Sequence, residues 1–134
     1  MRSSNELRFN LLFPLLLSVC FSGCTRSSLT INADKSYNGR TLTLRIGDGV
    51  KLSLAENPTT GYRWELLAKP EPYCVVVTDA YATNTGGGIG SGGTHNWDFR
   101  AVSKGTGTVS LAYGRPWEKD VAPAQTFKLT LVVE

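Results

Sequence analysis

Apolar and polar residues alternate along most of the chain from residue 42 onwards. Alternation with a period of two is typical of β-strands that bury one face. The six alternating groups are Leu42, Leu44 and Ile46; Val50, Leu52 and Leu54; Tyr62, Trp64 and Leu66; Trp97, Phe99 and Ala101; Val109, Leu111 and Tyr113; and Phe127, Leu129, Leu131 and Val133. A further strand is predicted from Val75 towards Tyr81. No window beyond residue 24 repeats with the period of a helix, so the pattern predicts an all-β domain.

Turn residues separate these predicted strands, and they complete the fold prediction. Short strands with turns about every 8 to 12 residues favour an immunoglobulin-like antiparallel β-sandwich of seven to eight strands. We assign residues 41–134 to this domain. Residues 24–40 are polar and are predicted to be a tether that leads into a first edge strand near Leu29 and Ile31. Cys74 is the single cysteine of the sandwich, so no disulfide is expected.

Three connections of the predicted sandwich should lie at the same end. Successive strands of an antiparallel sandwich alternate in direction, so every second connection emerges at one pole. The connections that contain residues 57–61, 86–93 and 114–123 are every second one. We therefore expect these three segments, which are far apart in the sequence, to form one surface carried by a rigid scaffold.

The first 23 residues are predicted to be a secretory signal. Arg2 and Arg8 precede an apolar run over residues 11–17, and small residues follow just before Cys24. The run is shorter than the roughly 20 residues that a membrane-spanning helix needs. Residues 21–24 look like a bacterial lipobox, which predicts that Cys24 is lipidated and anchors the chain in the cell envelope. A plain cleaved signal peptide is the alternative.

Charge and chemistry narrow the function classes. The formal net charge is +3, and it falls to +2 once Arg2, Glu6 and Arg8 are removed, which argues against nucleic acid as a partner. His95 is the single histidine, so we expect neither a metal site nor a catalytic triad and interpret His95 as structural or exposed at the rim. Cys74 has no obvious activating neighbour and is expected to be a buried apolar residue. Carboxylates are dispersed, and no catalytic pair stands out.

Residues 88–93 match the pattern G-x-G-x-x-G, which in dinucleotide-binding proteins opens a helix. Here Trp97, Phe99 and Ala101 alternate after the glycines and predict a strand. The dinucleotide interpretation therefore fails, and no cofactor is expected.

Each of the three connections allows an ordinary interpretation and a functional one. Asn57-Pro58-Thr59-Thr60-Gly61 is a tight turn, or a stiff loop that loses little entropy on docking. Gly90-Ser91-Gly92-Gly93 is a flexible linker, or a site where another backbone can approach closely. Arg115-Pro116-Trp117 offers two residue types that are enriched at binding hot spots, although Trp117 could also fold onto the core.

Taken together and in this order, the three motifs resemble the chagasin family of cysteine-peptidase inhibitors. The resemblance extends to residues 97–101 as the strand after the second motif and covers about residues 42–133. In this chain three further glycines, 86–88, precede the second motif.

The resemblance implies a reversible, tight-binding inhibitor of papain-like cysteine peptidases, and not an enzyme. Thr59 would lie nearest the Cys–His pair of the peptidase, and the other two loops would clamp the two sides. Tyr62 is included in the implied contact surface, and the protein is expected to be a monomer. The rival hypothesis is an envelope lipoprotein whose sandwich binds a glycan or a structural partner.

Overall fold

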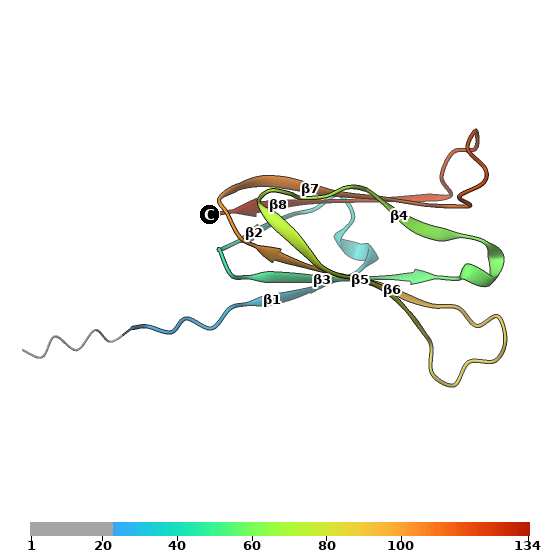
Figure 1. Cartoon of the computed structure of the whole chain (residues 1–134), viewed down its shortest axis with the longest axis horizontal. Coiled ribbons are helices and arrows are strands. Elements are labelled where there is room, and N and C mark those ends of the chain that lie inside the picture. The colour runs from blue at the N-terminus through green and yellow to red at the C-terminus, as the bar shows by residue number, and fades with distance from the viewer. Residues whose placement is uncertain (1–22) are drawn as a thin grey trace, which may run out of the picture.

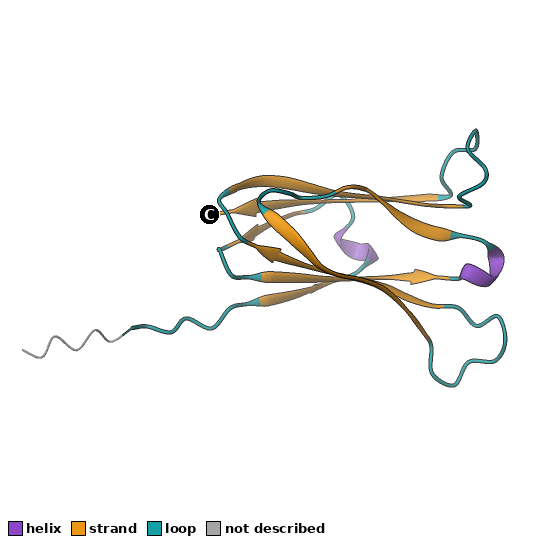
Figure 2. Cartoon of the chain, viewed as in Figure 1, coloured by secondary structure: helices purple, strands orange, loops and turns teal. Residues whose placement is uncertain are grey.

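The computed structural model describes residues 23–134, so the predicted apolar run of the signal lies outside the described residues. The described chain is all-β and forms two layers, as predicted (Figures 1 and 2). Its strands are β1 (Thr30–Ala33), β2 (Thr41–Leu44), β3 (Gly49–Glu56), β4 (Arg63–Ala68), β5 (Cys74–Thr83), β6 (Gly93–Ala101), β7 (Gly105–Gly114) and β8 (Gln125–Val133). Two 3-10 turns, η1 (Lys35–Tyr37) and η2 (Pro58–Thr60), complete it. Among residues 23–134, no helix is long and apolar enough to cross a membrane.

The two layers are four-stranded sheets with the strand orders β1-β3-β6-β5 and β2-β8-β7-β4. The strands β3, β6 and β5 pair antiparallel, and so do β4, β7 and β8. The predicted β-sandwich is confirmed, but two of its edge strands are not antiparallel, because β1 pairs parallel with β3 and β2 pairs parallel with β8. Strand direction alternates along the chain, but β2 belongs to the other sheet. The two like-directed strands β1 and β3 therefore become neighbours.

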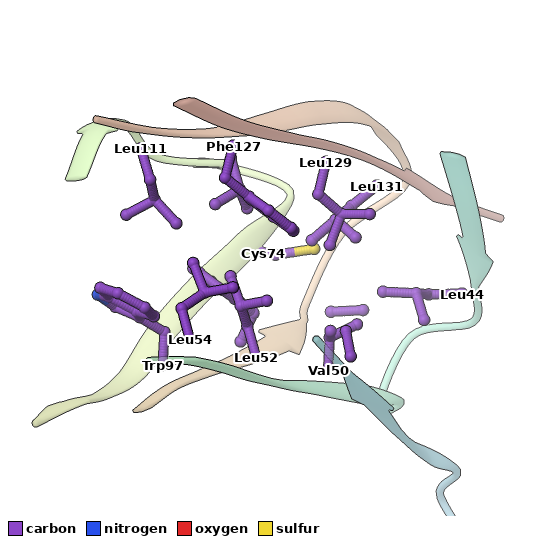
Figure 3. Packing of buried hydrophobic residues seen from close by; sticks show 14 of the residues in the cluster. Leu44, Val50, Leu52, Leu54, Cys74, Trp97, Leu111, Phe127, Leu129 and Leu131 are labelled. Atoms are coloured by element: carbon purple, nitrogen blue, oxygen red, sulfur yellow. The ribbon is translucent and has the colours of Figure 1, made fainter. Parts of the chain in front are cut away.

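The alternating apolar residues of the two sheets face each other and form the core (Figure 3). The predicted inward positions of β3, β6 and β8 are all buried, and Leu44, Val109 and Leu111 join them. Cys74 is fully buried, and this burial raises the pKa of its thiol. The prediction that Cys74 is a small core residue is therefore confirmed. A buried thiol with a raised pKa is also a poor nucleophile.

One aliphatic position and one aromatic position depart from the predicted strand pattern. Ile46 does not extend β2, because the chain turns after Leu44, and its side chain is exposed. The Asp48 carboxylate accepts hydrogen bonds from the backbone N–H groups of Arg45 and Leu29, both at 2.9 Å, and so fixes this turn. Tyr62 likewise precedes β4 instead of opening it.

The connections after β3, β5 and β7 emerge at the same pole, as the alternation of strand direction predicts (Figure 1). The described chain enters β1 from the opposite pole (Figure 1). The predicted first edge strand is confirmed as β1, which begins at Thr30. The fold thus separates the three loops from the N-terminal segment by the full length of the sandwich.

Candidate binding surface

Three loops form the candidate surface: the first loop (residues 57–62), the second loop (residues 84–92) and the third loop (residues 115–124). The second and third loops are hairpin connections within one sheet each, β5 to β6 and β7 to β8. The first loop instead joins β3 of one sheet to β4 of the other. It therefore crosses between the layers, with one hairpin loop on either side of it (Figure 2).

Asn57 organises the first loop as the cap of η2. Its side-chain oxygen accepts hydrogen bonds from the backbone N–H of Thr59 at 3.3 Å and from the Thr59 hydroxyl at 2.5 Å. The Thr60 hydroxyl donates to the Asn57 carbonyl at 2.7 Å. Pro58 occupies the first position of the turn, where its fixed φ is already suitable and its missing N–H costs nothing. Each residue type of the motif thus contributes to one stiff turn.

Gly61 ends the 3-10 turn in the left-handed conformation, with φ of +81°. A side chain at this position would be strained, which explains a glycine here. Thr59 and Thr60 are exposed although their hydroxyls are bound within the loop. The first loop therefore presents a preformed, compact tip.

Arg115 and Trp117 connect the third loop to the first. The Arg115 Nε donates to the carbonyl of Thr60 at 3.3 Å, and its guanidinium lies 4.6 Å from the centre of the Tyr62 ring. The same guanidinium pairs with Glu118 at 3.2 Å. The indole ring of Trp117 lies against Gly61, where a Cβ atom would collide with it. A depression of about 500 Å³ lies between these two loops.

Trp117 does not fold onto the core, since 66% of it is exposed. The sequence left this point undecided because a loop tryptophan can serve either a core or an interface. In the structure its ring edge rests on the first loop while most of its surface faces solvent. An exposed indole on a braced loop is a typical binding anchor.

The second loop is tied to the first by one side chain. The Asn57 Nδ2 donates to the carbonyl of Gly90 at 3.2 Å. Gly90 and Gly92 both have positive φ, and Ile89 is fully exposed between Gly88 and Gly90. Gly93 is buried at the start of β6 against the Ala82 carbonyl and the Tyr81 ring, where a side chain would collide with both. Gly93 is therefore part of the packing beneath the loop.

The family model described as Chagasin family peptidase inhibitor I42 matches residues 43–131, which include all three loops and most of both sheets. The chain belongs to the chagasin family of peptidase inhibitors. It is similar to chagasin from Trypanosoma cruzi, at 32% identity over 101 residues that cover 72% of this chain and 92% of that protein.

Solved structures agree with the fold of this chagasin-family chain. A crystal structure of a cysteine protease inhibitor from Entamoeba histolytica superposes with a TM-score of 0.70 at 22% identity, covering 81% of this chain and 99% of that one. An epitope scaffold based on an inhibitor of cysteine proteases gives a TM-score of 0.55 at 26% identity, covering 64% of this chain and 79% of the scaffold.

The chagasin-family chain brings most of the predicted contact residues to one pole. Their role in binding stays a prediction, and two of them also take part in the packing of the domain. Tyr62 is half-buried and stacks on Tyr113 with ring centres 5.5 Å apart, and Gly93 is buried. Cys24 is exposed on the described N-terminal segment and is not part of this surface.

Two residues beneath the loops were not singled out from the sequence. Tyr113 accepts a hydrogen bond from the backbone N–H of Asn57 at 3.2 Å through its hydroxyl. Glu56 is buried at the inward position that follows Val50, Leu52 and Leu54 in the alternation of β3. The sequence feature that could have identified Glu56 is a carboxylate at the next inward position of β3, directly before the first motif. Within residues 23–134, no group of three or more His, Cys, Asp or Glu side chains could hold a metal ion.

Proposed function

We propose that this chain is a tight-binding, reversible inhibitor of papain-like cysteine peptidases that blocks the active-site cleft with its three loops. The observation that carries the proposal is the joining of the three motifs at one pole through the Asn57–Gly90 and Arg115–Thr60 hydrogen bonds. Membership of the chagasin family supports inhibition, and a 26% identical scaffold that is based on an inhibitor of cysteine proteases supports the class of peptidase.

In this proposal the first loop enters the cleft and the hairpin loops contact the two rims. Thr59 lies at the exposed tip of the first loop and would come nearest the Cys–His pair of the peptidase. The loop is already held by its own hydrogen bonds, so little conformational entropy is lost on docking. Preformed binding loops of this kind favour tight association without rearrangement.

The geometry of the first loop also argues against cleavage. A peptidase substrate must place an extended peptide in near-attack geometry on the nucleophile. Residues 58–60 form a 3-10 turn that ends in a left-handed glycine, which is not an extended segment. We therefore propose that the inhibitor occludes the nucleophile without losing a peptide bond.

The test is a titration of papain with residues 24–134, followed through hydrolysis of a small fluorogenic substrate. The proposal predicts stoichiometric loss of activity at enzyme concentrations above the inhibition constant, with full recovery after dilution. No inhibition at micromolar concentrations would contradict it and would favour the rival glycan-binding or structural role.

We further infer that the chain is exported and acts as a monomer anchored by a lipid on Cys24. The support for the anchor is the lipobox-like sequence together with the exposure of Cys24. The described chain enters the sandwich at the pole opposite the loops, so this anchor would hold the binding surface away from the bilayer (Figure 1).

The anchor is tested by expressing the full chain in bacteria and separating membrane from soluble fractions. Cys24→Ser should move the protein from the membrane fraction to the soluble envelope fraction, whereas the control Ser28→Ala should not. An unchanged distribution of Cys24→Ser would contradict the lipid anchor.

A further inference from the structure

The first loop differs from its neighbours because no strand pairing joins its two ends. Glu56 ends β3 in one sheet and Trp64 lies in β4 of the other. The hairpin loops, in contrast, each join two strands that pair directly within one sheet. The position of the first loop therefore depends on contacts between the layers as well as on its hydrogen bonds to the other two loops.

Two hydrogen bonds of Trp64 bridge the layers directly below the first loop. The Trp64 backbone N–H donates to the Glu56 carboxylate at 2.7 Å. The Trp64 indole N–H donates to the carbonyl of Ala55 at 2.9 Å. These bonds join the last residues of β3 to the start of β4, so they set where the loop begins and where it ends.

The Glu56 side chain is energetically unfavourable at its buried position at the end of β3. It is 4% exposed and is the only buried charged residue in the part of the chain that the structure describes. Burial of a carboxylate is costly unless hydrogen bonds compensate for the lost water. A leucine would continue the apolar alternation of β3 without that cost, but it could not accept the bond from Trp64. The hydrogen bond from the Trp64 backbone N–H therefore explains why a carboxylate occupies this position.

His95 on β6 contacts the same carboxylate oxygen as the Trp64 backbone N–H. Its Nδ1 lies 3.1 Å from the Glu56 Oε2, and its Nε2 lies 2.6 Å from the Oδ1 of Asp79 on β5. The imidazole also stacks on Trp97, with ring centres 4.1 Å apart and an interplanar angle of 5°. A carboxylate oxygen thus lies within hydrogen-bond distance of each ring nitrogen, and Trp97 covers one face of the ring. A chain of contacts runs from β5 through β6 to the end of β3 and across to β4.

We propose that Glu56 is a positioning residue that fixes the first loop between the other two loops, and that His95 and Asp79 orient its carboxylate. Glu56 lies beneath the loop and does not touch the peptidase. Its effect on inhibition rests on the proposed function. Its effect on the order of the first loop does not, because that order is a property of the free protein.

The inhibition test compares Glu56→Ala with the conservative Glu56→Gln on residues 24–134. Glutamine keeps an oxygen that can accept from the Trp64 N–H, so it should restore most of the lost affinity. We expect Glu56→Ala to raise the inhibition constant against papain at least ten-fold and Glu56→Gln to stay within about three-fold of wild type. Leu44→Ala, a buried leucine in the edge strand β2, is the control for general destabilisation. It should lower the melting temperature without changing the inhibition constant per folded molecule.

The second readout is the backbone order of the first loop, measured by ¹⁵N relaxation on the free protein. Rigid backbone has an order parameter near 0.85 and flexible backbone lies below about 0.6. Glu56→Ala should lower the order parameters of Thr59, Thr60 and Gly61 while leaving those of the third loop unchanged. His95→Phe keeps a ring on Trp97 but lacks both nitrogens, and it should cause a smaller change in the same direction.

Unchanged order parameters in both variants would overturn the proposal. If Glu56→Ala does not fold, Glu56→Gln and His95→Phe still decide it: the proposal requires a normal loop in the first and a more mobile loop in the second. If wild type fails to inhibit papain, the proposed function falls, and the relaxation measurement still decides whether Glu56 positions the loop.

Discussion

Gly61 lies at the point where the first and third loops touch, and two separate demands exclude any other residue there. Its φ of +81° is unfavourable for a side chain, and a Cβ atom would collide with the Trp117 ring. Gly61 and Trp117 therefore depend on each other across the gap between two motifs. This contact gives a physical reason for finding both motifs in one chain.

Gly61→Ala should damage both stability and inhibition. The left-handed backbone alone costs an alanine about 1–2 kcal/mol, and the added methyl must also displace the indole. We expect a loss of at least this size in the free energy of unfolding, measured with urea, and an inhibition constant raised more than ten-fold. Gly88→Ala is the matched control, because its Cβ would meet no atom within 4 Å. Equal behaviour of the two variants would contradict this account of Gly61.

Trp117→Ala should separate binding from stability. Because 66% of Trp117 is exposed, its removal should change the melting temperature little. Loss of an exposed aromatic anchor should weaken peptidase binding by about 2 kcal/mol, or roughly 30-fold. The control is Val121→Ala, which removes another exposed side chain of the third loop and should have a small effect. A collapse of stability with unchanged affinity would make Trp117 a structural residue.

At the scale of elements, the first loop works only if it remains a closed turn. The Gly61 N–H donates to the carbonyl of Pro58 at 2.9 Å, and this bond closes the 3-10 turn. Two glycines inserted after Thr60 would open the turn, but a surface loop tolerates insertion with little loss of stability. The inhibition constant should rise at least ten-fold, equivalent to about 1.4 kcal/mol.

The same insertion also tests whether stiffness protects the loop from cleavage. Intact-mass spectrometry after long incubation with active papain should find wild type uncut and the lengthened loop open to cutting. Steady cleavage of wild type within residues 57–62 at ordinary substrate rates would contradict the non-cleaved mechanism.

The turn between β2 and β3 should make stability sensitive to acid. Hydrogen bonds from the Arg45 and Leu29 backbone N–H groups lower the pKa of the Asp48 carboxyl below its ordinary value of 3.8. A lowered folded-state pKa stabilises the fold fully above the ordinary value, and this stabilisation is lost as the pH falls through the lower folded-state value. Asp48→Asn should therefore melt below wild type at pH 6, and the gap should shrink below pH 3.8.

Thermal unfolding between pH 7 and pH 2 measures this gap. The control Asp120→Asn replaces an exposed aspartate of the third loop and should follow wild type throughout. A gap that stays constant or widens in acid would contradict the role assigned to the Asp48 carboxylate.

At the scale of the whole molecule, alternation and turn residues predicted the sandwich and the common pole of the three loops. Alternation determines which face of a strand is buried, and the parity of the connections determines at which end each loop lies. The parallel edges were missed because β1 and β2 are short, and their choice of sheet depends on tertiary packing.

The candidate site could be predicted only in part, because some of its residues are brought together by tertiary packing. The motif residues are consecutive in the sequence, whereas Glu56, Asp79 and His95 meet only after three strands pair. The position of His95 at the start of a strand favoured a structural or rim-exposed side chain but indicated no partner for it. The exposure of Trp117 was undecidable in advance because core and interface tryptophans have the same local sequence.

Whether the three loops together bind the peptidase is decided by mapping the papain-bound surface over the whole domain. Papain with its active-site cysteine blocked by a small methylthio group is added to ¹⁵N-labelled residues 24–134, and backbone amide signals are followed. We expect the strongest changes on residues 57–62, 84–92 and 115–124, while the turn around Asp48 at the opposite pole stays unperturbed. Changes centred on that turn or on the outer edge of β5, with the three loops silent, would contradict it.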